Sequence, residues 1–255
     1  MTRRPSFPAR LDNGPAKAAP ARPAAQHQPR LHDVPSGHGM DSQAVRARMV
    51  QKLAGQGVSD ARVLRAMGAV ERHRFVDSAL VNQAYEDTSL PIGLGQTISK
   101  PSVVARMIEL LLAGRTGADG RPGRVLEVGT GCGYQAAVLS CVATEVYSVE
   151  RLRGLHDKAR ENLRHFRLPN VHLLFGDGMV GFAKGAPYAG IIAAAGGEAI
   201  PAAWTEQLAE GGRLVAPMVT ATGQQALVVM EKAAGQLRQT LLEAVHFVPL
   251  KSGIA

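Results

Sequence analysis

A short apolar strand that runs directly into a glycine-rich loop constrains the fold of this chain more than any other feature. Residues 125–128, Val-Leu-Glu-Val, are followed by Gly129, Gly131 and Gly133 at alternate positions. Glycines at this spacing let the backbone turn tightly and bring peptide N–H groups close to a ligand. In a doubly wound sheet, the first strand ends at the crevice where ligands bind. The motif therefore predicts a nucleotide-type ligand site at the end of a central strand.

The chain beyond this loop alternates between apolar strands and helices. Strands are expected over residues 124–128, 145–149, 171–175, 190–194 and 213–217, and helices over 135–142, 152–166 and 203–209. Apolar strands that alternate with helices indicate a parallel sheet covered on both faces. Residues 225–232 and 239–248, joined by a turn at Gly235, predict an antiparallel edge. The expected fold class is α/β, with a mostly parallel, doubly wound sheet.

Residues 40–113 are expected to form a helical region in front of this sheet. Helices are predicted from Asp41 to the glycines at 55 and 57, after an N-cap at Asp60, and from Pro101 along an apolar stripe to Leu112. Residues 75–91 are expected to be irregular and to lead into a loop over residues 90–99. The helical region and the sheet together predict one domain over residues 40–255.

Residues 1–39 differ in composition from the rest of the chain. They hold seven of the fifteen prolines, and six basic side chains against two acidic ones. Such a segment buries too little apolar surface to offset the entropy of ordering, so we expect a disordered arm. A transit peptide is a weaker alternative, and Met40 is a candidate alternative start. Half of the net charge of +8 lies in this arm, which argues against nucleic acid as the partner of the domain.

Two acidic positions indicate which ligand the loop binds. Glu150 closes the next expected strand, where a carboxylate can accept hydrogen bonds from both hydroxyls of a ribose. Asp177 stands in a Gly-Asp-Gly triplet after the following strand, where its side chain can accept a hydrogen bond from an adenine amino group. Such a triplet is often just a turn, however. A dinucleotide fingerprint requires glycine where Tyr134 stands. An adenosine-containing ligand without a pyrophosphate therefore fits better than a nicotinamide cofactor. The remaining alternative is that the glycine loop serves only packing and binds no ligand.

Several further segments carry a specific pattern. They are Leu90–Gly93, Gln96–Ser99, Val125–Tyr134, Ser148–Glu150, Gly176–Gly178 and Val245–Leu250. Together they resemble the protein-L-isoaspartate O-methyltransferase family, from about Asp41 to the C-terminus. The glycine loop alone is typical of any class I methyltransferase, whereas the Gln-Thr-Ile-Ser loop and the terminal Phe-Val-Pro-Leu are more specific. The resemblance implies a Rossmann-like class I methyltransferase fold with added elements at both ends.

The resemblance also implies roles for particular residues. The methyl donor S-adenosylmethionine is expected to contact Thr97, Ile98, Glu127, Gly129, Thr130, Gly131, Gly133, Glu150, Asp177 and Gly178. Ser99 matches the active-site serine, and Val245, Phe247, Val248 and Pro249 match the strand that holds the substrate peptide with it. One departure lies at residues 193–198, Ala-Ala-Ala-Gly-Gly-Glu, where relatives often carry prolines, which implies a more mobile loop.

The chemistry of the implied reaction makes small demands on the side chains. A carboxylate is already ionised at neutral pH, so methyl transfer to it needs positioning and exclusion of water rather than a strong base. The neutral hydroxyl of Ser99 suits this role, and the alternative is that Ser99 merely caps the helix that begins at Pro101. No metal is expected, because neither the histidines nor Cys132 and Cys141 form a cluster at ligand spacing.

The predicted function is methyl transfer from S-adenosylmethionine to the free carboxylate of L-isoaspartyl, and optionally D-aspartyl, residues in damaged proteins, as the first step of their repair. One alternative is a class I O-methyltransferase for a small molecule, and another is a non-catalytic binding module recruited through the basic arm. Methylation of base amino groups is disfavoured, because Ala-Ala-Gly-Gly-Glu stands where such enzymes carry an Asn/Asp-Pro-Pro-Tyr motif. We expect a cytoplasmic monomer without membrane contact, since the chain lacks a signal peptide and a long apolar run.

Overall fold

The computed structural model describes residues 43–114, 117 and 120–255. The expected disordered arm, the candidate start at Met40 and the helix start at Asp41 lie outside the described residues. The described part between 43 and 255 belongs to one compact unit.

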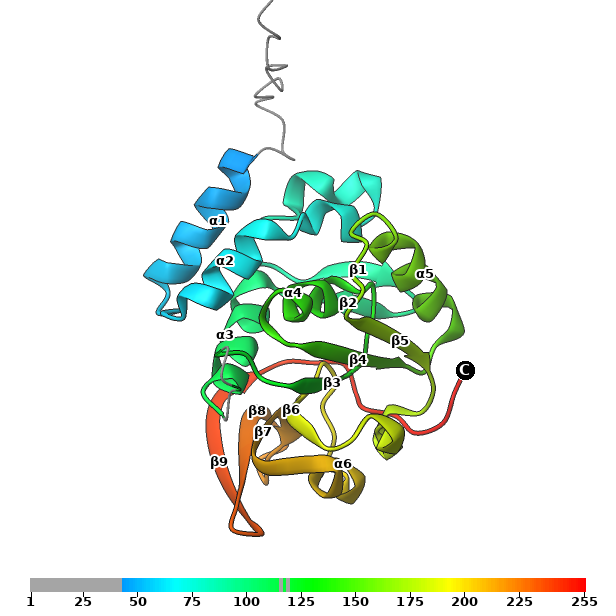
Figure 1. Ribbon diagram of the computed structural model, residues 1–255. Helices are drawn as coiled ribbons and strands as arrows, with labels where there is room; N and C mark the ends of the chain where they lie inside the picture. Colours follow the sequence, from blue (N-terminus) through cyan, green and yellow to red (C-terminus); the bar gives the residue numbers. More distant parts are fainter. Residues whose placement is uncertain (1–42, 115–116, 118–119) are drawn as a thin grey trace, which may run out of the picture. The chain divides into compact units, whose positions relative to one another are not determined.

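The central sheet of the described chain has seven strands in the order β5-β4-β3-β6-β7-β8-β9 (Figure 1). The strands are β3 (Arg124–Val128), β4 (Glu145–Glu150), β5 (Val171–Phe175), β6 (Tyr188–Ala193), β7 (Leu208–Val219), β8 (Gln225–Ala233) and β9 (Gln236–Val245). Neighbouring strands from β5 to β7 are parallel, and β7, β8 and β9 are antiparallel. The chain order reverses at β3, so the end of β3 is the switch point where ligands bind in such sheets. The expected α/β fold with an antiparallel edge is confirmed.

Helices cover both faces of this sheet. The α-helices of the described chain are α1 (Gln43–Gly55), α2 (Ala61–Ala69), α3 (Pro101–Leu112), α4 (Tyr134–Val142), α5 (Arg153–Leu163) and α6 (Ala202–Gln207). Helices α3, α4 and α5 pack on the sheet, and α1 and α2 pack outside α3 and α4 (Figure 1). The opposite face is covered by α6 and the short 3₁₀ helices η3 (Gly178–Val180) and η4 (Ala183–Gly185).

Alternate residues of β3 point into two separate cores. Val125 lies in the core beneath α1 to α5, whereas Leu126 and Val128 lie in the core on the other face, together with Trp204 of α6. Both faces of a central parallel strand must be buried, which explains the unbroken apolar run in the sequence. The one polar residue of this strand that enters a core is Glu127, whose side chain is fully buried.

The segment expected as a loop over residues 90–99 is a hairpin instead. Strands β1 (Leu90–Gly93) and β2 (Gln96–Ile98) pair antiparallel and bury Leu90, Ile92 and Ile98. The alternation of buried and exposed residues is present in the sequence, but Pro91 and the shortness of the strands conceal it. The preceding residues, expected to be irregular, contain the 3₁₀ helices η1 (Arg72–Phe75) and η2 (Ser78–Gln83).

The last expected strand, residues 239–248, is wrong at its end because β9 stops at Val245. Val245 pairs with Gln225, the first residue of β8, so the sheet has no partner for the residues that follow. The Gln225 side chain accepts from the Phe247 N–H at 2.7 Å, and Gly196 then exchanges hydrogen bonds with Val248 and Leu250. The C-terminal segment is therefore carried away from β8 towards the loop that follows β6.

A second boundary also differs from the prediction. Strand β7 begins at Leu208 rather than 213, directly after α6, and α6 ends at Gln207 rather than 209. Leu208 already pairs with Tyr188 of β6, and an irregularity in the ladder takes up residues 209–212 before Arg213 pairs with Gly190. Within the described residues, every helix is too short or too polar to span a lipid bilayer.

Candidate cofactor and acceptor sites

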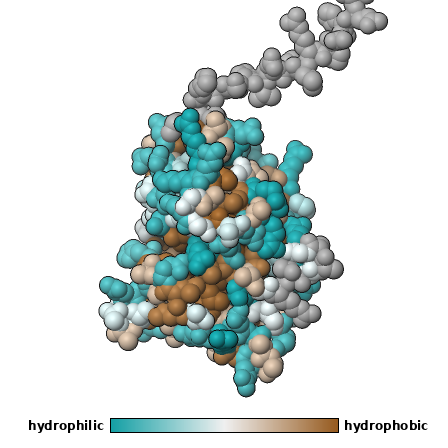
Figure 2. Space-filling view, turned by 90° about the vertical axis from the view of Figure 1, so that its left-hand side faces the viewer, coloured by the Kyte–Doolittle hydropathy of each residue, from teal (hydrophilic) through white to brown (hydrophobic). Residues whose placement is uncertain are grey.

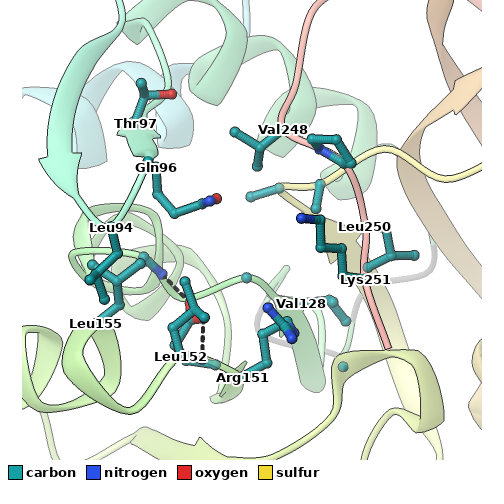
Figure 3. A pocket seen from close by; sticks show the side chains of 18 of the residues that line it. Leu94, Gln96, Thr97, Val128, Arg151, Leu152, Leu155, Val248, Leu250 and Lys251 are labelled. Atoms are coloured by element: carbon teal, nitrogen blue, oxygen red, sulfur yellow. Dashed lines mark hydrogen bonds between the residues drawn. The ribbon is translucent and has the colours of Figure 1, made fainter. Parts of the chain in front are cut away.

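A cavity of about 430 Å³ opens at the carboxyl ends of β3 and β4. The glycine loop forms its floor through Gly129 and Gly131, and the hairpin forms one wall through residues 94–97. The residues after β4, 149–152, and the C-terminal residues 248–251 complete it. Figure 3 shows Leu94, Gln96 and Thr97 on the hairpin side and Val248, Leu250 and Lys251 on the opposite side. This volume is typical of a site for a small organic ligand.

The glycine loop has the backbone shape that the sequence predicts, but its glycines serve different purposes. Gly129, Gly131 and Gly133 all have positive φ, at 90°, 58° and 91°. A Cβ at Gly131 would come within 3.2 Å of Ile92, on the cavity side, so this glycine leaves room beside the ligand space. A Cβ at Gly133 would come within 3.1 Å of Leu163, and Gly133 does not line this cavity. Gly133 therefore lets α5 approach the loop, which is the packing role.

Glu150 lies where the sequence places it, at the end of β4 on the cavity wall. Its carboxylate is buried and accepts the N–H of Gly131 at 2.9 Å and that of Leu152 at 2.9 Å. These bonds fix the carboxylate between the glycine loop and the start of α5. Each carboxylate oxygen has lone pairs in reserve, so Glu150 can still accept hydrogen bonds from ligand hydroxyls.

Glu127 lies behind the glycine loop and does not line the cavity. The Ser148 hydroxyl donates a short hydrogen bond to it, and that hydroxyl lies 2.6 Å from the Thr130 hydroxyl. Complete burial raises the pKa of Glu127 to about 8, a little offset by the hydrogen bond from Ser148. In this arrangement Glu127 supports the loop through Ser148 and Thr130 rather than facing the ligand space.

Asp177 and Gly178 also occupy different positions. Gly178 lines the cavity, and a Cβ there would lie 2.5 Å from Val128, so only glycine fits. Asp177 is absent from the cavity wall, and its two oxygens accept the N–H groups of Met179 at 2.8 Å and Gly253 at 2.6 Å. The carboxylate is therefore engaged by its own turn and by the C-terminal segment.

A second hollow, of about 410 Å³, contains Ser99. Val245, Phe247 and Val248 line it together with Ser99, so the predicted acceptor residues lie together, with the exception of Pro249. Pro249 lines the first cavity instead. Both hollows share Thr97, Ala194 and Val248, which form the boundary between them.

The helix-capping alternative for Ser99 does not match the structure. The N-cap position of α3 is Lys100, and the Ser102 N–H is bound by the Asp87 carboxylate at 2.9 Å. Burial raises the pKa of Asp87, but the bonds from Ser102 and the charge of Lys100 outweigh it and hold that pKa below its usual range. Asp87 therefore caps α3 from outside the helix, and the Ser99 hydroxyl has no hydrogen-bond partner among the described residues.

Ile98 and Thr130 lie between the two hollows. Both line a small space of about 40 Å³ that also touches Thr97, Ser99 and Cys132. Burial raises the pKa of Cys132 to about 11, so its side chain stays a thiol at neutral pH. Among the described residues, no three His, Cys, Asp or Glu side chains lie close enough to hold a metal ion.

The structure adds cavity residues that sequence reasoning did not identify. They are chiefly Leu94 and Gln96 of the hairpin, Arg151 and Leu152 after β4, and Lys251 near the C-terminus. Gln96 and Arg151 are adjacent in sequence to residues that the sequence analysis assigned to the site, and this adjacency could have identified them. Lys251 likewise follows the singled-out segment Val245–Leu250, but its place at the cavity depends on the return of the C-terminal segment.

A third hollow of about 490 Å³ continues the acceptor hollow along α3 and β9. Lys100, Val103, Ala244 and Val245 line both, so the two form one groove. Strand β9 is the outer strand of the sheet. Figure 2 faces the side of the molecule that carries β9 and shows apolar side chains gathered there among polar ones. An extended polypeptide can lie along such a groove beside the outer strand of a sheet.

Comparison with known proteins identifies relatives over nearly the whole described chain. The model of the family described as protein-L-isoaspartate(D-aspartate) O-methyltransferase matches residues 43–255. A protein-L-isoaspartate O-methyltransferase of Methylibium petroleiphilum is 59% identical, over 98% of this chain and 96% of its own length. One of Leptothrix cholodnii is 56% identical, over 94% of this chain and 85% of its own length.

Solved structures agree with these matches. A protein-L-isoaspartate O-methyltransferase superposes with a TM-score of 0.73 at 29% identity, covering 82% of this chain and 67% of its own. A Plasmodium falciparum protein solved in complex with S-adenosyl-L-homocysteine gives a TM-score of 0.69 at 22% identity, covering 81% and 98%, which shows the shared fold. The cavity at the switch point and the matched family together lead to one assignment: this chain belongs to the protein-L-isoaspartate(D-aspartate) O-methyltransferase family.

Proposed function

We propose that this protein transfers a methyl group from S-adenosylmethionine to the free carboxylate of isoaspartyl residues in damaged proteins, as the first step of their repair. The observation that carries the proposal is the junction of the two hollows at Thr97, Ala194 and Val248. A donor in the first cavity and a carboxylate in the second would face each other across this boundary. The family assignment supports the same reaction.

The first cavity suits S-adenosylmethionine on structural grounds. Gly131 and Gly178 leave space that a side chain would fill, and Glu150 offers lone pairs where ribose hydroxyls are expected. We place the adenosine between Glu150 and Gly178 and the methionine part towards the hairpin, where Gln96 points into the cavity (Figure 3). When bound, S-adenosylmethionine supplies an electrophilic methyl group on a positively charged sulfur.

The residues of the acceptor hollow orient the carboxylate and exclude water. An isoaspartyl carboxylate is ionised at neutral pH and needs no proton removed before it attacks. The Ser99 hydroxyl, which lacks a partner within the described chain, can donate to one carboxylate oxygen and leave the other directed at the methyl group. Thr97, Ile98 and Val248 surround this point and limit the access of water, which otherwise stabilises the separated charges.

The shape of the acceptor groove favours a polypeptide over a small-molecule acceptor. The groove continues from Ser99 along α3 and β9 through a further hollow of about 490 Å³, longer than a small acid requires. Residues 244–248 line the groove at the end of the outer strand β9, where an extended peptide can lie. D-aspartyl residues present a similar free carboxylate and form the secondary substrate class of this proposal.

The same proposal covers partners and location. Damaged proteins are the partners, the enzyme acts as a monomer, and it acts in the cytoplasm without nucleic acid or membrane. The groove supports a polypeptide partner, and the modest positive charge of the domain argues against nucleic acid.

The direct test is methyl incorporation from labelled S-adenosylmethionine into matched peptides. One peptide carries isoaspartate, and its control has the same sequence with normal aspartate. We expect label in the first peptide and background in the second. Equal labelling of both peptides, or labelling of neither with transfer to a small acid, would refute the proposal.

A further inference from the structure

Lys100 places an unpaired positive charge on the groove beside Ser99. It directly follows Ser99 in the sequence, and it lines both the acceptor hollow and the continuation of that hollow along α3 and β9. Its side chain is exposed, and its ammonium group makes no hydrogen bond or ion pair among the described residues. The charge therefore stands next to the residue that orients the acceptor carboxylate in the proposed reaction.

The other full charges on the groove walls are already matched. Arg106 of α3 and Glu243 of β9 line the continuation of the hollow, and they pair with each other from Nε to Oε1 at 3.0 Å, where Figure 1 shows α3 and β9 side by side. Arg106 also pairs with Glu109 through Nη1 at 3.3 Å. The remaining titratable side chain on these walls is His246, in the acceptor hollow. Among the described residues, the uncompensated charge of the groove is that of Lys100.

Asp87 lies close to Lys100 but does not neutralise it. Burial raises the pKa of Asp87, but the hydrogen bonds from Ser102 and the charge of Lys100 outweigh this effect and hold that pKa below its usual range. The Asp87 carboxylate nevertheless accepts the Ser102 N–H at 2.9 Å and forms no ion pair with the Lys100 ammonium. Lys100 can thus pair with an anion that arrives in the groove.

We propose that Lys100 is a specificity-determining residue that binds an acidic side chain flanking the isoaspartyl residue, so that the enzyme prefers damaged segments with a nearby glutamate or aspartate. The inference rests on the proposed function, because it takes the isoaspartyl carboxylate to lie at Ser99 and the peptide to lie along the groove.

The geometry of an extended peptide allows this contact. Such a chain advances about 3.4 Å per residue, and a lysine ammonium sits on a long flexible stem. Lys100 can therefore meet a side chain a few positions from the isoaspartyl residue, on the flank of the peptide that lies in the groove. Exposed ion pairs contribute little, so the expected result is a preference and not a requirement. A lysine at the same peptide position is disfavoured, because like charges oppose each other.

The variants change the charge at one position. Lys100→Gln removes it, Lys100→Glu reverses it, and Lys100→Arg retains it. The side chain is exposed, so none of these changes disturbs a core. Lys184→Gln is the matched control, because it removes the same charge from an exposed lysine that lines neither hollow.

The measurement is methyl transfer from labelled S-adenosylmethionine to isoaspartyl peptides that differ at one residue, which is glutamate, glutamine or lysine. This residue is moved along each flank of the isoaspartyl residue in turn, and the assay is run at pH 8, where histidine side chains carry little positive charge. On one flank, we expect the wild-type KM to be about two- to fivefold lower for the glutamate peptide than for the glutamine peptide, and higher by a similar factor for the lysine peptide. The value of kcat should not change, because the contact is the same in the ground state and the transition state.

The variants then decide whether Lys100 is responsible. Lys100→Gln should abolish the preference, Lys100→Glu should invert it, and Lys100→Arg and Lys184→Gln should keep it. In about 1 M salt, where the screening length is about 3 Å, the wild-type preference should also disappear. A rise in KM that is equal for all three peptides in Lys100→Gln would overturn the proposal, because Lys100 would then attract the isoaspartyl carboxylate itself. Equal preferences on both flanks, or a loss of preference in Lys184→Gln, would also overturn it in favour of long-range attraction by the net charge.

The same assay separates this proposal from the proposed function. A wild-type protein that methylates all the isoaspartyl peptides with the same KM retains the proposed reaction and excludes the role of Lys100. A wild-type protein that methylates none of them removes the reaction itself.

Discussion

Ser99 is the residue on which the proposed reaction depends most directly. Its hydroxyl lies in the acceptor hollow, and Asp87 performs the helix capping that would otherwise explain it. We expect Ser99→Ala to lower kcat by about 10- to 100-fold, since a misplaced acceptor is costly to the rate. Calorimetry should show S-adenosylmethionine binding within about twofold of wild type, because Ser99 does not line the first cavity.

Thr88→Ala serves as the control for that variant, because Thr88 is exposed and lines neither hollow. It should methylate isoaspartyl peptides at the wild-type rate. An unchanged kcat in Ser99→Ala would remove the hydroxyl from the catalytic role.

Glu150 links the ligand space to the backbone that shapes it. Its carboxylate holds the N–H groups of Gly131 and Leu152, so Glu150→Ala leaves both without their acceptor. We expect S-adenosylmethionine to bind at least about tenfold more weakly, since each hydrogen bond to a charged group contributes about 1.5–3 kcal/mol. Titration calorimetry measures this directly. Glu145→Gln, at the half-buried start of β4, the end of that strand away from the cavity, should bind like wild type, and normal binding by Glu150→Ala would move the ribose contact elsewhere.

Glu127 makes stability depend on pH in a direction unusual for a carboxylate. Its pKa is raised from 4.5 to about 8 by burial, so the unfolded chain loses this proton near pH 4.5 while the folded protein keeps it until about pH 8. Between these values the folded state binds more protons, and the free energy of unfolding falls as the pH rises. We expect Glu127→Gln to remove this decline, by at most about 1.4 kcal/mol per pH unit.

Denaturant unfolding of both proteins from pH 5 to pH 9 checks this prediction. The difference in stability between Glu127→Gln and wild type should shift in favour of the variant up to about pH 8 and then stay constant. A difference that is constant from pH 5 to pH 9 would show that Glu127 is ionised in the folded protein.

At the scale of elements, helix α3 depends on a cap that is remote in sequence. The Asp87 carboxylate binds the Ser102 N–H and so fixes the start of α3 beside Ser99. We expect Asp87→Ala to cost about 1 kcal/mol and to lower Tm by about 2–4 °C. Asp87→Asn retains an acceptor oxygen and should keep most of that stability. Calorimetric melting curves of the two variants test this, and equal Tm values for Asp87→Ala and wild type would exclude the cap.

The elements differ in how far the sequence predicts them. The parallel strands β3, β4 and β5 were predicted to within a residue, because each is a short, mainly apolar segment bounded by polar loop residues and too short for a helix. The hairpin β1–β2 was missed, since its strands are too short for period-two alternation to stand out and it includes Pro91. The end of β9 was placed too far along, because only the pairing with Gln225 decides where the ladder stops.

The candidate site shows the same division. The positions of Gly129, Gly131 and Glu150 on the cavity wall follow from local motifs at strand ends, whereas Ser99 was singled out through the family resemblance, in a segment expected to be a loop. The shielded position of Glu127 and the engagement of Asp177 with Gly253 depend on tertiary contacts between distant segments. Sequence motifs predict which strand end a residue occupies. They do not predict which distant segments of the chain contact that residue in the folded protein.

At the scale of the whole molecule, residues 43–255 contain every part of the proposed machinery. All the hollows are lined by residues between Gln56 and Lys251, and the family match begins at residue 43. We therefore expect a variant without residues 1–39 to methylate isoaspartyl peptides at a rate within about twofold of the full chain, because no site residue is removed.

The same deletion separates an enzyme from a module recruited through its basic arm. The arm holds half of the net charge of +8, so a binder that depends on it should lose its partner at physiological salt once the arm is gone. The rate of labelled methyl transfer by the full chain and the shortened chain, measured at low and at physiological salt, distinguishes the two. A shortened chain that retains its rate at both salt concentrations places the activity in residues 40–255. A rate that falls only for protein substrates, and not for peptides, would instead assign the arm a role in capturing damaged proteins.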